Sequence, residues 1–137
     1  QNHVDAAYSL AWDVHTDVCS SELPRYVEMQ HVIPDLFHQP FDRKVLAHHN
    51  YMPIQSVLFS RGLYDKHGGF NEGLDALEDW VLWKKYACHA EFVFVPKTTS
   101  IFRTPAALAE RARRHQWLHS AYKGASEIYR DELLGQS

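Results

Sequence analysis

The feature that most constrains this chain is the segment EDWVLWKKYACH, residues 78–89, which predicts one helix carrying two tryptophans. Asp79 shares a helical face with Leu82, Trp83 and Tyr86, because residues three, four and seven apart lie on the same side of a helix. This apolar stripe must be buried. A carboxylate at its head is costly unless the carboxylate is paired or opens into a cleft. Asp79 therefore needs a role beyond helix formation.

The adjacent acid, Glu78, has an adequate structural role. Asp75-Ala-Leu-Glu78 has the spacing of a capping box, in which Asp75 accepts the Glu78 backbone N–H and Glu78 reaches back. Acids in the first turn are also favoured by the helix dipole, by about 0.3–1 kcal/mol each. Asp79 beside Trp80 and Trp83 suits a general base, because burial and the neighbouring acid raise its pKa while the helix terminus lowers it. The sequence does not decide the sign of the net shift.

The remaining segments predict an α+β fold, with a small mixed or antiparallel sheet, packed helices and a long C-terminal helix. Proline and glycine positions mark the boundaries between these segments. The expected elements are a strand at 6–14, a loop at 13–24, a short helix within 23–33 before Pro34, a short helix after an Asp42 N-cap that ends at 50–53, a strand at 56–60, a helical segment from 61 stopped by Gly68 and Gly69, strands at 91–96 and 98–104, and a helix from Pro105 to about Leu134.

Composition limits the functional classes. The chain has 137 residues, of which 45% are hydrophobic, so it is long enough for one core and too short for two independent domains. A net charge of -3 disfavours nucleic-acid binding, and the cluster Arg111, Arg113 and Arg114 is expected to be a solvated helix face. No apolar run is long enough to span a membrane. The two cysteines, Cys19 and Cys88, suit a reducing, cytoplasmic location, although they leave one disulfide open.

Residues 50–104 carry an ordered set of motifs. A strand and a short helix lead to a Gly-Gly-Phe-Asn-Glu turn at 68–72, then to Glu-Asp-Trp-Val-Leu-Trp at 78–83, then to Val-Pro at 95–96 and Phe-Arg at 102–103. This set resembles the second half of the GT-A catalytic domain of family 2 glycosyltransferases. The resemblance implies a transferase that moves a sugar from a nucleotide-sugar donor to an acceptor hydroxyl with inversion. Residues 1–104 would form the acceptor-side half and residues 105–137 a helical extension.

The same resemblance implies residue roles. Asp79 would be the catalytic base, and Glu78 would support the site. Arg103 would lie close to the phosphates of the donor, with a surface ion pair as the alternative. Trp80 would stack on a sugar ring, and Met52 would form a wall of the acceptor pocket, with core packing as the alternative for both residues.

The donor-binding half of such an enzyme is not found in this sequence. A D-x-D motif, whose carboxylates hold a divalent metal in the family, does not occur, and neither does a glycine-rich phosphate loop. We therefore expect this chain to be part of a longer enzyme that uses Mg²⁺ or Mn²⁺, and to be inactive alone. The chain itself is expected to hold no cofactor.

Two other classes remain open. A metallohydrolase would use His115 and His119, which are spaced i, i+4, but no third ligand and no H-E-x-x-H motif accompany them. A non-catalytic carbohydrate- or protein-binding module would instead expose a large aromatic patch. A cleft at Asp79 favours the enzyme, whereas a sealed Asp79 favours the module. The aromatic residues considered for that patch are Tyr8, Trp12, Tyr51, Trp80 and Trp117.

Overall fold

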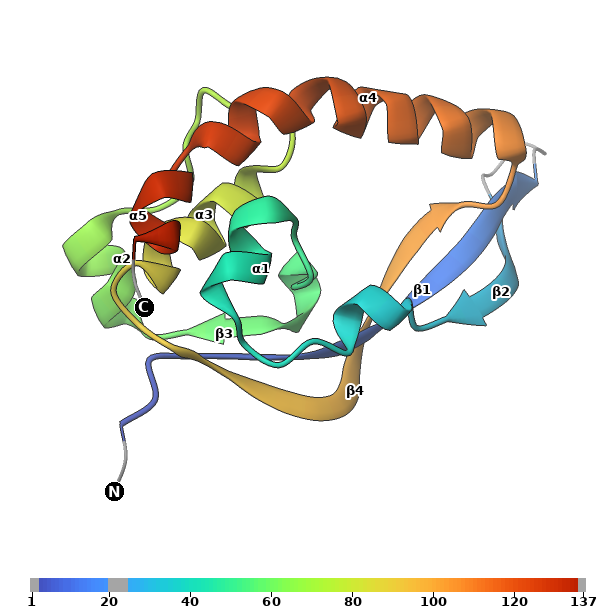
Figure 1. The fold of residues 1–137 in the computed structure, drawn as a ribbon. Coiled ribbons are helices and arrows are strands. Elements are labelled where there is room, and N and C mark those ends of the chain that lie inside the picture. Colours follow the sequence, from blue (N-terminus) through green and yellow to red (C-terminus); the bar gives the residue numbers. More distant parts are fainter. Residues whose placement is uncertain (1–2, 20–24, 136–137) are drawn as a thin grey trace.

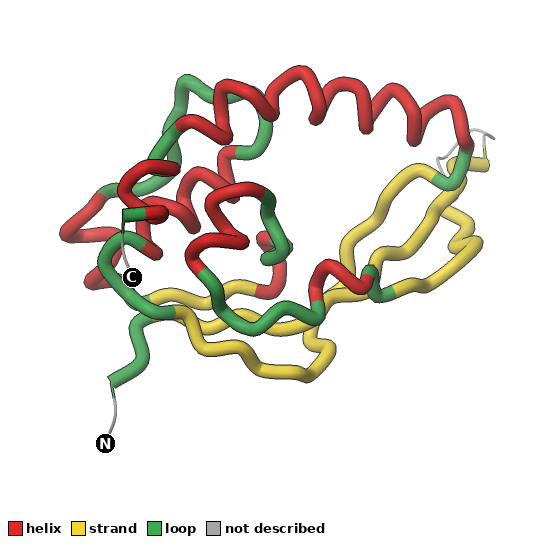
Figure 2. Tube along the Cα trace, in the orientation of Figure 1, coloured by secondary structure: helices red, strands yellow, loops and turns green. Residues whose placement is uncertain are grey.

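The computed structural model describes residues 3–19 and 25–135, which form an α+β fold as predicted. A mixed sheet lies below a layer of helices, and one long helix spans the top of the molecule (Figures 1 and 2). The strands are β1 (Ala6–Cys19), β2 (Arg25–Val32), β3 (Val57–Phe59) and β4 (Phe92–Pro105). The helices are α1 (Arg43–His48), α2 (Arg61–His67), α3 (Glu78–Ala87), α4 (Leu108–Glu127) and α5 (Arg130–Leu134), with short 3₁₀ turns η1 (Asp35–Phe37) and η2 (Ile54–Ser56).

β1 is the central strand of the sheet. One of its edges pairs with β4 in parallel over residues 6–16. Its other edge is divided between two antiparallel partners, since residues 6–8 pair with β3 and residues 13–19 pair with β2. Residues opposite one another in a sheet point to the same face, so Leu58, Ala7 and Val93 share a row that faces away from the helices.

The predicted loop at 13–24 and the predicted helix at 23–33 are wrong for the described residues. β1 continues to Cys19, and the helix is replaced by β2. The β-branched residues Val14, Thr16 and Val18 recur at every second position. Val14 and Thr16 are buried, and Val18 is exposed. That period of two is the strand signal. Pairing along β1 then holds β2 extended, although most of its side chains are exposed.

The C-terminal third also differs from the prediction. The two strands expected at 91–96 and 98–104 form the single strand β4, whose register against β1 shifts at irregularities near Leu10. Pro105 is the last residue of β4, not the first of a helix, and it lies opposite Thr16. The long helix begins at Leu108 and breaks at Tyr129, which has a left-handed φ of 59°, before α5 begins.

Two predicted helix boundaries are confirmed. The Asp42 side chain caps α1 by accepting hydrogen bonds from the backbone N–H groups of Lys44 at 2.8 Å and Val45 at 3.2 Å. Gly68 ends α2 with a φ of +82°, a backbone conformation that favours glycine. Local sequence chemistry is sufficient to place both boundaries.

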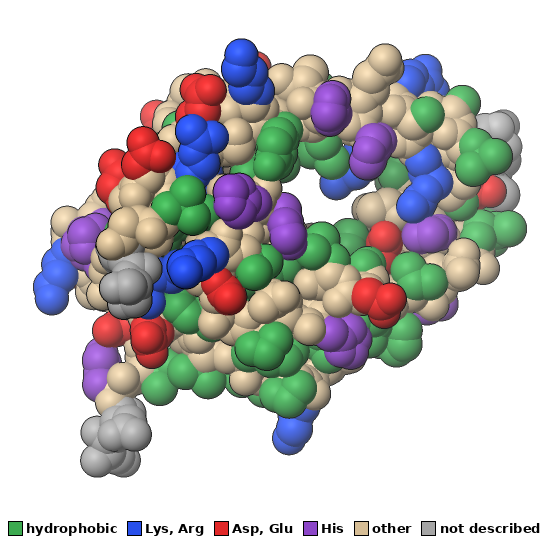
Figure 3. Space-filling view, in the orientation of Figure 1, with side chains coloured by type: hydrophobic (Ala, Val, Ile, Leu, Met, Phe, Trp, Pro, Cys, Tyr) green, Lys and Arg blue, Asp and Glu red, His purple; other side chains and the backbone are tan. Residues whose placement is uncertain are grey.

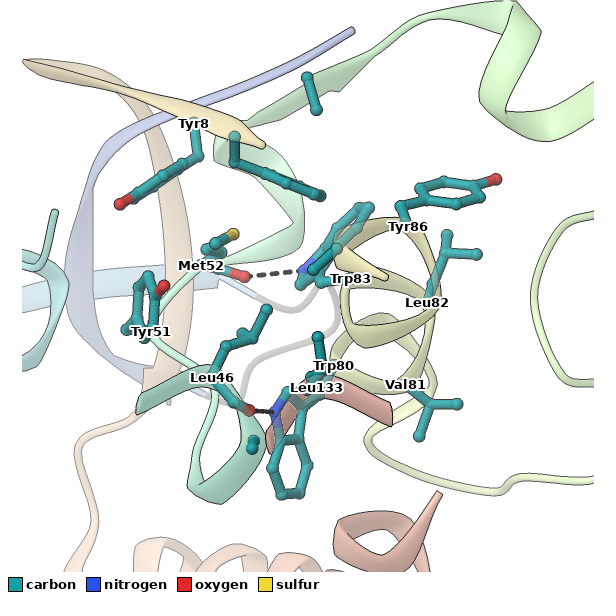
Figure 4. Packing of buried hydrophobic residues seen from close by; sticks show 14 of the residues in the cluster. Tyr8, Leu46, Tyr51, Met52, Trp80, Val81, Leu82, Trp83, Tyr86 and Leu133 are labelled. Carbon is teal, nitrogen blue, oxygen red and sulfur yellow. Dashed lines mark hydrogen bonds between the residues drawn. The ribbon is translucent and has the colours of Figure 1, made fainter. Parts of the chain in front are cut away.

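α3 is the centre of the core, and it is buried on more sides than the predicted stripe. Trp80 and Trp83 are each about 1% exposed, and their indole N–H groups donate to main-chain carbonyls of α1 and of the segment that follows it (Figure 4). Trp80 donates to the Leu46 carbonyl at 2.7 Å, and Trp83 donates to the Met52 carbonyl at 3.1 Å. Buried indoles need such partners, so these two bonds hold residues 46–52 against α3.

Lys84 connects α3 to the end of the long helix. Its side chain is fully buried, and its Nζ donates to the carbonyls of Ala125 at 2.6 Å and Ser126 at 3.3 Å in the last turn of α4. The same ammonium lies 4.1 Å from the ring centroid of Trp80. Burial lowers the pKa of Lys84 to about 8. A cation at a helix C-terminus satisfies carbonyls that lack partners within the helix, so Lys84 fixes α4 to the core.

Within the described part of the chain, none of the helices is long and apolar enough to cross a membrane. The two C-terminal helices pack instead against the same core as the rest of the fold. Ala125 of α4 and Leu133 of α5 are both buried members of the cluster around α3. α4 therefore returns to the core only at its end, and its earlier turns span the space above the sheet (Figure 1).

We predict that Lys84→Met lowers the free energy of unfolding by about 1–3 kcal/mol, because two buried carbonyls lose their charged donor. The measurement is urea unfolding at neutral pH. Lys123→Met, which changes an exposed lysine of α4, is the matched control and should stay within about 0.5 kcal/mol of the wild type. Equal stability of Lys84→Met and the control would show that the buried bonds do not fix the helix.

Candidate functional site

Asp79 lies at the edge of a pocket of about 440 Å³, formed between the start of α3, the segment after α1, and α4. Its side chain is half-buried and faces this pocket. Among the described residues, Asp79 makes no ion pair. The pocket is lined by Phe37, Asn50, Met52, Pro53, Ile54, Gln55, Ala76, Leu77, Glu78, Asp79, Phe102, Arg114, Trp117 and Leu118.

Asn50 positions the Asp79 carboxylate. Its side-chain amide donates to Asp79 Oδ2 at 3.3 Å, while Asn50 Oδ1 accepts the backbone N–H of Met52 at 3.0 Å. The other carboxylate oxygen of Asp79 accepts the backbone N–H of Trp80 at 2.7 Å. The carboxylate is thus held by two neutral donors. Asn50 was not among the predicted site residues, because its sequence neighbourhood suggested only the end of a helix.

The pKa of Asp79 is raised above its ordinary value. Burial is the largest cause, and the hydrogen bond from the Trp80 backbone N–H opposes it. The negative charge of Glu78 raises the pKa further, and the Asn50 amide lowers it. Desolvation therefore outweighs the hydrogen bonds, which decides the sign that the sequence left open.

The predicted capping box at Asp75 and Glu78 is wrong. The N-cap of α3 is Leu77, which has a left-handed φ of 61°, and no side chain caps the helix. A left-handed leucine is uncommon and costs about 1–3 kcal/mol where the surrounding structure imposes it. The Glu78 side chain makes no hydrogen bond or ion pair with the described residues and lines the pocket. The two acids therefore face the same pocket, and Glu78 is not used by the helix cap.

The predicted contact residues Met52 and Trp80 have different positions. Met52 lines the pocket but is fully buried, and its carbonyl accepts the Trp83 indole N–H. Trp80 is stacked on Tyr122, with ring centroids 5.4 Å apart, and it also contacts the Lys84 ammonium. Trp80 is about 1% exposed, so its ring is packed in the core, as in the alternative that the sequence left open, and is not available for the predicted stacking on a sugar.

Arg103 does not lie at the Asp79 pocket. It is exposed on β4, where its guanidinium donates to Glu28 of β2 at 3.5 Å, and it lines a separate hollow beside Thr16. This is the surface pairing that the sequence left as the alternative for Arg103. The cation at the pocket is Arg114 of α4, which contributes to the wall together with Trp117. Arg114 and Trp117 reach the Asp79 pocket because α4 returns over the sheet, and no local sequence pattern predicts this return.

The described residues contain no group of three His, Cys, Asp or Glu side chains that could hold a metal ion. His115 and His119 line another hollow, beneath α4, without a third ligand. The disulfide that the sequence left open stays a prediction, because the Cys19 side chain lies outside the described residues. The Cys88 thiol hydrogen-bonds to the Lys84 carbonyl at 3.3 Å, and burial raises its pKa.

The aromatic residues considered for a binding module do not form one exposed patch. Tyr8, Tyr51 and Trp80 are buried in the core. Trp12 on β1 and Trp117 on α4 are partly exposed, at 38% and 49%, and lie on different elements. Trp117 lines the Asp79 pocket. Trp12 contacts the edge of the His31 ring.

Comparison of this chain with family models, curated proteins and solved structures found no match. The resemblance to family 2 glycosyltransferases therefore depends on the motifs alone. The geometry adds an independent observation, which is that the second acid of the pair opens into a pocket.

We predict that Asp79→Asn gains stability relative to the wild type as the pH rises from about 4 to about 7. A raised folded-state pKa means that the folded protein binds more protons than the unfolded chain in this range, so the wild type loses stability with rising pH. The asparagine variant does not titrate. The measurement is the difference in free energy of unfolding between variant and wild type at each pH.

The control for this measurement is Asp65→Asn, which removes an exposed carboxylate that pairs with Arg61 at 3.7 Å. Its stability difference from the wild type should change much less with pH, because the carboxylate is solvated. Only the change with pH is diagnostic, since asparagine also alters the hydrogen bond with Asn50. A difference that is constant with pH for Asp79→Asn would contradict the burial of a charged carboxylate.

Proposed function

We propose that this chain is the acceptor-side part of an inverting glycosyltransferase, with Asp79 as the general base. The observation that carries the proposal is the position of Asp79, whose carboxylate faces a pocket, is held by neutral donors and is paired with no cation among the described residues. An ion-paired or sealed carboxylate would not serve this reaction. The ordered motifs of residues 50–104 agree with this assignment.

The chemistry requires one base. The acceptor hydroxyl oxygen forms a bond to the anomeric carbon of the donor sugar, and the bond from that carbon to the nucleoside diphosphate breaks from the opposite face. The hydroxyl proton passes to Asp79, and the diphosphate leaves with the bonding electrons. A carboxylate whose pKa is raised by burial accepts a proton more readily than a solvated one, which supports Asp79 in this role.

Other residues orient the reactants. Asn50 fixes the rotation of the Asp79 carboxylate, and Glu78 offers a second acceptor for hydroxyl groups at the pocket rim. Met52 supports the pocket floor from a buried position. In place of Trp80, the exposed indole of Trp117 is the aromatic surface available to a sugar ring. Pocket walls that combine apolar area with a few polar groups are typical of such sites.

The donor and its metal belong to the remainder of the proposed enzyme. Among the described residues, no three His, Cys, Asp or Glu side chains come together as a metal site, and no step here uses a metal. We propose that a donor-binding half with a D-x-D motif binds the nucleotide sugar and the ion. The chain alone would then not turn over. The same proposal includes a cytoplasmic location for the protein. It also includes partners that are sugars and hydroxylated acceptors and not nucleic acids.

We predict that Asp79→Asn in the full-length protein lowers the rate of sugar transfer at least about a hundredfold while donor affinity stays nearly unchanged, because only the proton acceptor is lost. The assay is nucleoside diphosphate release from a panel of nucleotide sugars in the presence of hydroxylated acceptors. Donor affinity is measured by calorimetry.

Glu78→Gln is the matched control, since it changes the neighbouring acid of the same pocket. It should reduce transfer less than Asp79→Asn does. If Asp79→Asn retained transfer and Glu78→Gln lost it, the general base would be Glu78 and the assignment of Asp79 would be wrong. Absence of both donor binding and transfer in the wild-type full-length protein would favour a binding module instead.

A further inference from the structure

A second hollow lies beside the Asp79 pocket, between the underside of α4 and the end of β4, with a volume of about 790 Å³. Figure 3 shows an opening beneath the long helix, with histidine and basic side chains at its edge. We call this hollow the α4 cavity. Its lining contains two arginines, two histidines and no acid: Thr104, Pro105, Arg111, Ala112, Arg114, His115, Gln116, Leu118 and His119.

The basic groups of the α4 cavity are available for a ligand. Among the described residues, the side chains of Arg114, His115 and His119 make no hydrogen bond or ion pair. Arg111 is anchored, because its Nη1 donates to Thr104 Oγ1 at 3.1 Å and to the Pro105 carbonyl at 3.0 Å. These bonds use only one nitrogen of its guanidinium, so further donors remain. The predicted solvated helix face at Arg111, Arg113 and Arg114 is exposed at Arg113 and Arg114, and Arg111 and Arg114 also line this cavity.

The helix spacing gathers these groups on one side. Arg111, Arg114, His115 and Leu118 follow the pattern i, i+3, i+4, i+7, which places them on one face of α4. Arg113 is off this face and pairs with Glu110 at 3.6 Å. The α4 cavity therefore takes its charge from a specific face of the helix, and the neighbouring arginine is directed elsewhere.

The α4 cavity adjoins the Asp79 pocket. Arg114 and Leu118 line both, so a ligand in one can extend into the other. The charges are separated along this path, with Glu78 and Asp79 at one end and the basic groups of α4 at the other. No ion pair joins Arg114 to either acid in the described part of the chain. A ligand with a hydroxyl at one end and an anion at the other matches this distribution.

We propose that the acceptor carries an anionic group, a phosphate or a carboxylate, which binds Arg114 in the α4 cavity while the reacting hydroxyl reaches Asp79. His115 and the free donors of Arg111 complete the anion site. Arginine binds both kinds of anion with paired, charge-assisted hydrogen bonds. The inference depends on the proposed function for the role of the ligand as an acceptor. The anion site itself depends only on the α4 cavity.

The test is calorimetric titration of this chain with glucose 6-phosphate, glucuronate and glucose. We expect at least one anionic probe to bind about tenfold or more tightly than glucose. Tighter binding of glucose 6-phosphate would identify a phosphate, and tighter binding of glucuronate would identify a carboxylate. Equal binding of all three probes, or no binding of any, would overturn the proposal.

Arg114→Gln should weaken the favoured anionic probe about tenfold and leave glucose unaffected. Arg113→Gln removes the same charge from the outer side of α4 and should have no effect. Arg114→Lys should restore part of the affinity. The same loss in both glutamine variants would mean that net charge, and not the α4 cavity, attracts the anion.

Two further outcomes separate this inference from the proposed function. Anion binding by the full-length protein without any sugar transfer would remove the proposed function and keep the anion site. Transfer to neutral and anionic acceptors at equal rates, with no effect of Arg114→Gln, would remove the anionic acceptor and keep the glycosyltransferase.

Discussion

The site depends on two hydrogen bonds made by buried indoles. Trp80 and Trp83 of α3 donate to the carbonyls of Leu46 and Met52, which lie on either side of Asn50 in the sequence. The segment between these carbonyls is therefore fixed against the helix that carries Asp79, and the Asn50 amide is held beside the carboxylate. Core packing and site geometry are the same set of contacts, so α3 cannot shift without changing the surroundings of Asp79.

The second constraint is the return of α4 to the core. Lys84 binds the last turn of α4, while β4 leads the chain away from the core to the far end of the sheet. α4 must span the distance between these two points, and its underside then faces the start of α3 (Figure 1). This places Arg114 and Trp117 at the pocket wall. A helix held at its two ends thus supplies one side of a pocket whose other side is α3.

Much of this could be predicted from local patterns, and the rest depends on long-range contacts. The Asp42 cap, the stop at Gly68 and the burial of α3 follow from residue chemistry within a few positions. The period of two in residues 14–18 was a strand signal that the loop assignment missed. The capping box failed because Leu77 adopts a left-handed conformation, which tertiary packing and not propensity decides. Arg114 and Asn50 could not be found, because their roles arise from segments distant in sequence.

The buried amine of Lys84 has a consequence for chemical labelling. Burial lowers the pKa of this amine to about 8, which makes the amine easier to deprotonate than that of a solvated lysine, yet the closed structure denies access to acylating reagents. Modification can occur only when the end of α4 separates from α3. The rate at which an amine reagent acylates Lys84 would therefore report how often the helix lifts from the core and the cavity beneath it opens.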